Sequence, residues 1–558
     1  MRYSRRYLAF IIIIALALLI KTNTWRDEYA EVKAFRGAEL SSDIFSSYIS
    51  KNVNESGNLT LTVDGDSYIN QTEGLYVASD MSVMAELSFV RDIFSCSARG
   101  YDEKRVLLET GEDVYSFPIG SLAVTKNGAE YSLLHSATYI DGRYFLPIQE
   151  LCDIFGFGYD WNGKTYDLSL SSEKADEPLL PKKYDLRDKE RSAGIKDQGN
   201  ASTCWAYAAI GALESSCLPE EPESFQAEDL IANNTYHRDA KDGGDYRIAA
   251  SYFLSWTGPV MDGMVKKHVQ EVHFFRNEDV ERIKWAIFKD GGVSSPIYID
   301  SAVSGMKGSA YYKTEKNAYY YSGDKEPNHD IVIIGWDDDF SADNFKEKPE
   351  GNGAFICQNS WGNNFGENGV FYVSYYDSLI GETAVSYVGV EGTNNFDNIY
   401  QTDLCGQVGE MGYGKNSIYA ANIYHASADE TVMAAGFYAL SDKTKFKISV
   451  VPDYHNTNDL LNPPVAVESH VNERGYYTIR FDEGVPVSAG EDFAVVINII
   501  TEDTNMPLAI EYQGESLKNT VDITDGKGFV SKNGMDWESL EETKEANVCL
   551  KAYTIYSK

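Results

Sequence analysis

The chain is poor in cysteine. It contains 7 cysteines in 558 residues, and they are widely scattered, with no Cys-x-x-Cys pair and no spacing typical of metal ligands. The sequence is therefore not that of a disulfide scaffold, and it predicts neither a metal nor any other cofactor.

Basic residues are also few for the length. Lysine and arginine number 49 against 85 aspartates and glutamates, which gives a net charge of −36. Such an acidic chain does not attract nucleic acid or anionic membranes through its overall field, so we expect neither interaction. The length fits about three or four domains, and 39 tyrosines with 45 glycines favour β-rich modules that are secreted or surface-exposed.

Long apolar runs are absent except at the N-terminus. Three arginines precede an apolar run over 7–20, which is shorter than the roughly 20 residues that a bilayer span needs and fits a signal peptide. No clear cleavage site follows, so residues 1–22 are a signal peptide or a membrane anchor. We expect export, with membrane contact through this segment only. The glycosylation sequon at Asn200 favours a bacterial source, because a glycan would obstruct the loop before Cys204.

A polar spacer over 23–58 leads to an internal repeat over 59–170. Its period is 61 residues, with Asp-Ile-Phe at 92–94 and again at 153–155, each after an apolar segment that is typical of a strand. The pattern predicts an α+β repeat module that serves as a stalk. The run over 144–162 resembles the copper amine oxidase N-terminal-like domain of bacterial surface proteins, a name that implies no copper here because the chain has no ligand cluster.

A polar, proline-ended linker over 171–178 precedes the stretch that carries the chemistry. Apolar and small residues from Trp205 to Leu213 recur at helical spacing, and Ser202 or Thr203 is placed to cap that helix. Cys204 would then lie in the first turn, where the helix dipole favours a thiolate. This is how a nucleophile is usually presented, although most cysteines are only small core residues.

Two later segments supply candidate partners for this cysteine. His329 stands at the start of an apolar, β-branched run that predicts a buried strand. A second predicted strand ends at Asn359, whose side-chain carbonyl can accept a hydrogen bond from the imidazole, and Trp361 follows as a screen against water. A lone histidine is more often structural than catalytic, so the assignment depends on the whole set.

The set resembles the papain family of cysteine peptidases over 179–391. Gln198, Cys204-Trp205, Asn328-His329 and Asn359-Ser360-Trp361-Gly362 occur in the family's order. The resemblance implies a two-lobed domain with a helical lobe and a β-barrel lobe. It also implies Cys204 as nucleophile, His329 as acid and base, Asn359 as the group that orients His329, and Gln198 as oxyanion donor. Gly243 and Gly244 take the family's substrate-wall position, and Trp361 completes the predicted substrate-binding set.

The sequence departs from the family's pattern around the nucleophile. Ala201 and Lys241 stand where the family has the two halves of a disulfide, and the larger Ser202 and Thr203 precede Cys204. The loss of both halves together indicates a coherent variant, and we expect Cys217 and Cys357 to remain unpaired.

The last block, 392–558, alternates predicted strands and turns in the manner of a β-sandwich. It resembles the lectin-like domain that follows papain-type peptidases in exported bacterial proteins, which implies a cell-wall or carbohydrate ligand. A structural brace for the peptidase fits the pattern equally well.

Together these features predict a multidomain α+β protein: an exported, surface-associated bacterial cysteine peptidase, and an endopeptidase, that hydrolyses peptides or proteins. The alternatives are a surface adhesin with a catalytically silent peptidase fold and a cell-wall amidase. The complete Gln198, Cys204, His329 and Asn359 set argues against the first, and the oxyanion glutamine with the Asn-Ser-Trp-Gly motif argues against the second.

Overall fold

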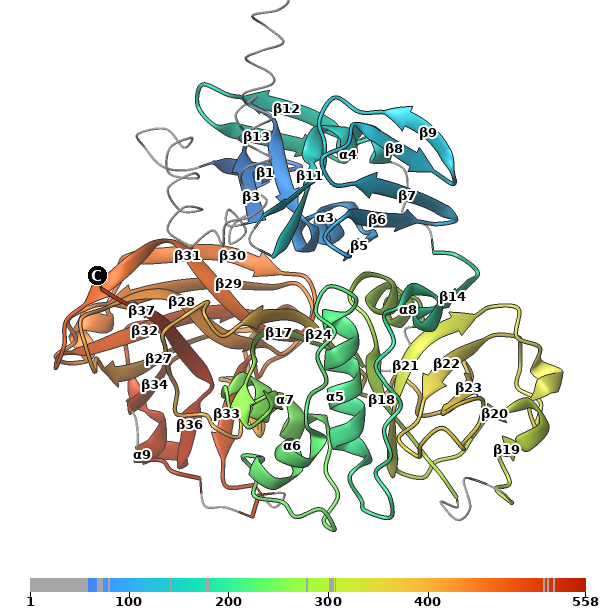
Figure 1. Cartoon of the computed structure of the whole chain (residues 1–558). Helices are drawn as coiled ribbons and strands as arrows, with labels where there is room; N and C mark the ends of the chain where they lie inside the picture. Colours follow the sequence, from blue (N-terminus) through green and yellow to red (C-terminus); the bar gives the residue numbers. More distant parts are fainter. Residues whose placement is uncertain are drawn as a thin grey trace, which may run out of the picture.

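The computed structural model describes residues 59–557, with gaps at 68–73, 79–80, 141, 176–179, 277–279, 301–305, 307, 515–516, 519–520 and 525–526. The predicted signal or anchor segment 1–22 and the spacer 23–58 lie outside the described residues. Three blocks follow one another along the chain and pack together (Figure 1). Among the described residues, no helix is long and apolar enough to cross a bilayer.

The N-terminal block is built from small sheets and two short helices (Figure 1). Its elements are β1 (Thr60–Val63), β2 (Asp66–Ser67), β3 (Leu75–Val77), β4 (Val83–Glu86), α3 (Leu87–Phe94), β5 (Ser97–Tyr101), β6 (Arg105–Thr110), β7 (Asp113–Pro118), β8 (Ala123–Lys126), β9 (Ala129–Ser132), β10 (Thr138–Ile140), β11 (Arg143–Pro147), α4 (Ile148–Phe155), β12 (Gly158–Asn162) and β13 (Asp167–Ser171).

The 61-residue sequence repeat corresponds to a repeated strand–helix unit in this block. Strand β4 continues into α3, and β11 continues into α4. The two strands pair antiparallel, with Ala85 opposite Leu146. Phe94 and Phe155 hold equivalent positions in the two units, and their rings stack with centroids 5.0 Å apart. The two strand–helix units of the repeat therefore bury their apolar faces against each other.

The central block carries most of the helices and the cysteine set. Its elements are β14 (Lys183–Asp185), α5 (Cys204–Cys217), α6 (Ala227–Asn233), α7 (Tyr246–Leu254), β15 (Val260–Met261), β16 (Met264–Val265), β17 (Lys267–Phe274), α8 (Val280–Lys289), β18 (Val293–Ile297), β19 (Tyr312–Lys313), β20 (Ala318–Tyr319), β21 (His329–Asp337), β22 (Ala354–Gln358), β23 (Val370–Ser374) and β24 (Val385–Gly392).

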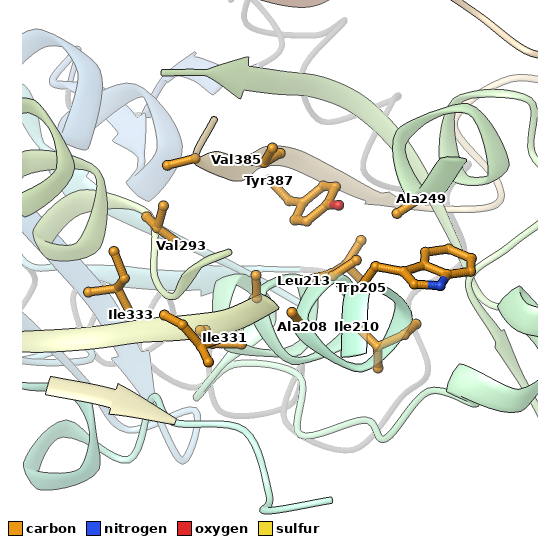
Figure 2. Packing of buried hydrophobic residues seen from close by; sticks show 14 of the residues in the cluster. Trp205, Ala208, Ile210, Leu213, Ala249, Val293, Ile331, Ile333, Val385 and Tyr387 are labelled. Carbon is orange, nitrogen blue, oxygen red and sulfur yellow. The ribbon is translucent and has the colours of Figure 1, made fainter. Parts of the chain in front are cut away.

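Helix α5 is buried on almost every side. The sequence predicted a single apolar stripe, but twelve of its fourteen residues are buried, because strands cover one face and α6 and α7 cover another. Figure 2 shows Trp205, Ala208 and Leu213 of the helix among residues of these neighbours. Small side chains permit the close approach: a Cβ on Gly211 would lie 3.2 Å from Val332. A helix that is apolar on all sides is typical of a fully buried helix.

The start of α5 differs from the prediction in one respect. Thr203 is the N-cap residue, but neither it nor Ser202 caps the helix through its side chain. The carbonyl of Thr203 instead accepts hydrogen bonds from the backbone N–H groups of Ala206 and Tyr207. Thr203 is buried, so its position is set by packing.

The C-terminal block is a β-sandwich, as predicted. Its elements are β25 (Asn398–Tyr400), β26 (Gly409–Met411), β27 (Ser417–His425), β28 (Glu430–Ala439), β29 (Thr444–Val451), β30 (Val465–Val471), β31 (Gly475–Val487), β32 (Asp492–Ile500), β33 (Leu508–Tyr512), β34 (Lys527–Ser531), β35 (Glu538–Ser539), α9 (Leu540–Lys544), β36 (Ala546–Val548) and β37 (Leu550–Tyr556).

One sheet runs without interruption from the central block into this sandwich. Strand β17 pairs with β24 on one side and with β31 on the other, where Val272 lies opposite Tyr476. The buried core of the central block also includes side chains from the sandwich, among them Tyr438, Tyr476 and Leu517. Ion pairs from Arg282 to Asp442 and Glu473 add to the junction. The two blocks therefore share a sheet and a core.

The N-terminal block contacts the central block through a buried arginine. Arg99 of β5 donates hydrogen bonds to the carbonyl oxygens of Ser216 (3.2 Å), Lys289 (2.8 Å) and Asp290 (2.6 Å). These carbonyls lie at the C-terminal ends of α5 and α8, where backbone acceptors have no partner within the helix and a cation is favoured. A second buried arginine, Arg191, donates to Ser97 of the same strand at 3.1 Å.

Replacing Arg99 should weaken the whole assembly. We expect Arg99→Met to lower the free energy of unfolding by about 2–4 kcal/mol, because three buried carbonyls lose a charged donor. Urea unfolding followed by tryptophan fluorescence measures the change. Arg105→Met on the neighbouring strand is the control, since Arg105 is exposed. Equal unfolding midpoints for the two variants would contradict this role of Arg99.

The shared sheet predicts that the central block does not fold alone. A fragment covering 180–392 exposes the edge of β17 and the apolar surface beneath Tyr438 and Tyr476, so we expect it to aggregate or to lack fixed tertiary packing. Near-ultraviolet circular dichroism and size-exclusion chromatography of this fragment, beside 180–557, test the point. A soluble fragment with a cooperative thermal transition would show that the sandwich is dispensable.

Candidate active site

Three of the four predicted catalytic residues line one open cleft in the central block, and the fourth, Asn359, lies behind His329. Its volume is about 1380 Å³, and Gln198, Cys204 and His329 all contribute to its lining. Cys204 comes from the N-terminus of α5, and His329 comes from the first position of β21. Residues that are 125 positions apart in the sequence are therefore brought to one site by the packing of β21 against α5.

The orientation of His329 follows from its hydrogen bond to Asn359. Nε2 of His329 lies 2.9 Å from Oδ1 of Asn359. The backbone N–H of Ser360 donates to the same Oδ1 at 2.8 Å, which identifies that atom as the carbonyl oxygen. An amide oxygen only accepts, so Nε2 carries the proton, and Nδ1 of the neutral ring is left as a base.

Trp361 covers this pair. Its ring centroid lies 4.8 Å from that of His329, and Phe365 packs edge-on against Trp361 at 5.0 Å. His329 and Asn359 are both buried. The aromatic rings therefore cover the His329–Asn359 pair on one side, and Trp361 also lines the cleft, while its screening role stays a prediction.

Gln198 is held in place by the residue that follows Asn359. Oγ of Ser360 donates to Oε1 of Gln198 at 2.6 Å, and the backbone N–H of Gln198 donates to the carbonyl of Ser360 at 2.9 Å. Nε2 of Gln198 donates to the carbonyl of Ala201 at 2.7 Å. An amide nitrogen has two protons, so one remains for a group in the cleft.

The predicted glycine wall forms part of the cleft lining. Gly243 has a φ of +69°, and a Cβ on Gly244 would lie 2.6 Å from the Trp205 ring, so a side chain at either position is disfavoured. Arg238 donates to the carbonyls of Asp242 (2.7 Å) and Gly243 (3.2 Å) and fixes the loop. Lys518 of the sandwich forms an ion pair with Asp242, so the C-terminal block supports this wall.

Burial opposes charge on Cys204 and on His329. It raises the pKa of the Cys204 thiol to about 12. It also lowers the pKa of His329 to about 4, although the hydrogen bond to Asn359 by itself raises the pKa of His329. Both shifts favour a neutral thiol beside a neutral imidazole in the unliganded site. The thiolate that the helix N-terminus favours is therefore opposed by the surroundings of Cys204.

Two residues of the site have no role in the sequence-based prediction. Asp330 places Oδ2 3.9 Å from Sγ of Cys204, and its negative charge also raises the pKa of that thiol. Ser360 links Asn359 to Gln198. Both were visible as immediate neighbours of predicted catalytic residues, but nothing in their spacing marks either one as part of the site.

All seven cysteines are free and buried, and of the seven only Cys204 lines the cleft. Cys217 and Cys357 are unpaired, as the sequence predicted. Of the two larger residues that precede the nucleophile, Ser202 lines the cleft while Thr203 is buried beneath it. No group of three or more candidate metal ligands occurs among the described residues.

Comparison with known families divides the chain in the same way. Residues 180–388 match the papain family of cysteine proteases, and residues 399–554 match the lectin-like domain. The central block is therefore a papain-family, cysteine-type peptidase domain followed by a lectin-like domain. The copper amine oxidase-like resemblance of the N-terminal block stays a prediction.

Curated relatives of the chain are cysteine proteases of modest identity. A cysteine protease of Blomia tropicalis is 25% identical over 283 residues, which are 43% of this chain and 78% of that protein. Probable cysteine protease RD19B of Arabidopsis thaliana is 25% identical over 226 residues (35% and 58%), and cathepsin S of Bos taurus is 27% identical over 214 residues (34% and 59%). The matches thus span less than two thirds of the latter two proteins.

Two solved structures share the fold across both domains. The clostridial cysteine protease Cwp84 after propeptide cleavage has a TM-score of 0.59 at 22% identity, covering 67% of this chain and 99% of that one. The protease and lectin-like domains of Cwp84, a surface layer associated protein of Clostridium difficile, give 0.58 at 22% identity, covering 67% and 89%. The predicted papain-like fold class is confirmed.

The carboxylate of Asp330 should set the pH at which Cys204 becomes reactive. A unit charge 4 Å away is worth about 1 kcal/mol even at the dielectric constant of water, which corresponds to roughly 0.7 pKa unit. Because a negative charge disfavours the thiolate, Asp330→Asn should lower the pKa of Cys204 by at least that much. The pH dependence of Cys204 alkylation by iodoacetamide, followed by mass spectrometry, measures the shift.

Asp343→Asn, at an exposed position in the short 3-10 helix Ala342–Asn344, is the matched control for this experiment. It should leave the alkylation profile of Cys204 unchanged. An Asp330→Asn profile that coincides with the wild-type profile, or that moves to higher pH, would contradict the electrostatic role of Asp330.

Proposed function

We propose that this protein is an exported cysteine endopeptidase that hydrolyses peptide bonds through Cys204, His329, Asn359 and Gln198. The observation that carries the proposal is the meeting of Cys204 and His329 in one open cleft, with Asn359 fixing the tautomer of the histidine. The papain-family match of 180–388 supports the same reaction class.

The chemistry begins with a proton transfer within the neutral pair. Nδ1 of His329 takes the proton of the Cys204 thiol as the sulfur attacks the carbonyl carbon of the peptide. The imidazolium then protonates the leaving amine, and a thioester remains on Cys204. His329 next removes a proton from water, which attacks the thioester and releases the acid. Asn359 keeps Nδ1 directed at the reacting atoms in both steps.

The oxyanion of each tetrahedral intermediate needs preorganised donors. The second amide proton of Gln198 and the backbone N–H of Cys204 are the candidates, and one such donor is typically worth about 3–4 kcal/mol of barrier. The bonds from Gln198 to Ser360 and Ala201 support this role, because they hold the amide in one orientation before substrate arrives.

The shape of the cleft supports cleavage within a chain. Its lining residues fall between positions 197 and 383 of the sequence, and none of the described residues before Asp197 belongs to it. The N-terminal block docks at the far end of α5 and leaves the cleft open. An extended substrate can therefore pass the nucleophile with residues on both sides of the scissile bond.

Location and partners form the second half of the proposal. The signal-like segment 1–22 directs the chain out of a bacterial cell, or anchors it in the membrane if it is retained, and the similarity to a surface layer associated protein supports a cell-surface position. The lectin-like domain braces the catalytic block through the shared sheet and takes a cell-wall or carbohydrate ligand. No observation favours the silent adhesin or the amidase over the peptidase.

Variants of the three central residues rank the proposed roles. Cys204→Ala should abolish peptide cleavage, and His329→Ala should reduce kcat nearly as far. Asn359→Ala should retain more activity, because β21 and Trp361 still position the imidazole. Steady-state kinetics on a peptide library measure the ranking, with circular dichroism to show that each variant folds.

Unchanged turnover in Cys204→Ala would exclude this residue as nucleophile, whereas the absence of any turnover in the folded wild type would favour the silent adhesin. An Asn359→Ala variant as inactive as Cys204→Ala would contradict the ranking of roles.

A further inference from the structure

The lining of the cleft is strongly acidic. Among the described residues, five carboxylates and a single arginine contribute to it; the carboxylates are Asp197, Asp245, Glu326, Asp330 and Glu382, and the arginine is Arg247. An excess of one sign in a cleft with low-dielectric walls concentrates ions of the opposite sign. The cleft therefore attracts cationic groups as peptides approach.

The single arginine is already engaged. Arg247 donates to Oδ2 of Asp245 at 2.6 Å, and the same aspartate caps α7 through the backbone N–H of Arg247 at 2.9 Å. Asp245 therefore has a basic partner of its own. This leaves Asp330 as the carboxylate nearest the nucleophile that has no basic partner among the described residues.

Asp330 is placed where a substrate must pass. It follows His329 on β21, and its Oδ2 contacts Sγ of Cys204 at 3.9 Å, in the lining of the cleft. Burial, with a contribution from Asp245, raises the pKa of its carboxyl to about 7. Asp330 is half-buried. A carboxylate that is partly removed from water without a counter-ion is disfavoured, and a cation supplied by a ligand stabilises it.

We propose that Asp330 is a specificity-determining residue that binds a cationic nitrogen of the substrate next to the scissile bond. The inference rests on the proposed peptidase function and adds the class of substrate: peptides with arginine, lysine or a free α-amino group near the cleaved bond. A charge-assisted hydrogen bond spans about 2.8 Å, so the cation lies within about 7 Å of Sγ of Cys204.

That distance restricts the position of the cation in the substrate. An extended chain advances about 3.3 Å per residue, so a free α-amino group lies within about two positions of the bond that Cys204 attacks, and a lysine or arginine at these positions can reach Asp330 through its side chain. Binding also neutralises the charge that disfavours the thiolate. The cation therefore assists both the docking of the substrate and the formation of the nucleophile.

The test compares matched cationic and neutral peptides on the full chain. N-acetylated peptides carry arginine or its neutral isostere citrulline at each of the two positions on either side of the cleaved bond. For wild type we expect kcat/KM to be at least tenfold higher for arginine at one of these positions, with a smaller difference in 1 M NaCl. In Asp330→Asn the ratio should fall below about threefold, while Asp343→Asn should keep the wild-type ratio.

A second series separates the two sources of the cation. It uses neutral peptides with a free or an acetylated N-terminus near the cleaved bond. A preference for the free amine that Asp330→Asn removes supports Asp330 as a site for the α-amino group, and an arginine preference in acetylated peptides supports a site for the side chain.

Two results would overturn the inference, and they differ in what else they overturn. Equal cleavage of cationic and neutral peptides by wild type, or an arginine preference that Asp330→Asn retains, removes the role of Asp330 and leaves the peptidase intact. Failure of untreated enzyme to cleave any peptide, when a parallel sample shows that Cys204 is free and reacts with iodoacetamide, overturns the proposed function and the inference with it.

Discussion

The burial of helix α5 is the constraint on which the rest of the structure depends. Strands β21, β18 and β24 and helices α6 and α7 all pack on this one helix, and its small residues allow them to do so closely. A helix enclosed in this way cannot shift along its axis without opening a core, so Cys204 at its first turn is fixed relative to His329 on β21. The geometry of the cleft therefore depends on the packing around α5.

The flanking blocks act on the same helix and its surroundings from outside the cleft. Arg99 of the N-terminal block binds carbonyls at the far end of α5, and the lectin-like domain extends the sheet that lies on it. The sandwich also reaches the glycine wall through Lys518. The cleft is therefore supported from three sides by residues that lie far from the chemistry, so changes in either flanking block can alter catalysis.

Much of the fold and the site could be predicted from the sequence, for identifiable reasons. Gln198, Cys204, His329 and Asn359 occur in the order and context of a known family, and the helix, the strand and the β-rich C-terminal block follow from periodicity. The pairing of β17 with β31 could not be predicted from the sequence, because it joins two strands that lie far apart along the chain and that have no sequence signal for each other. Asp330 was missed for a related reason: its neighbour on β21 carries the recognisable chemistry, while its own contact is with a residue 126 positions earlier.

The pairing of β17 with β31 also imposes an order on folding. Val272 and Tyr476 are partners across that pair although 204 positions separate them. A chain is synthesised from its N-terminus, and pairings between distant segments form late because a long loop must close first. Until the sandwich is complete, β17 keeps an open edge and the wall beside Gly243 lacks its support. Cys204 is thus placed in a complete cleft only near the end of folding, and we expect proteolytic activity only once the chain is nearly whole.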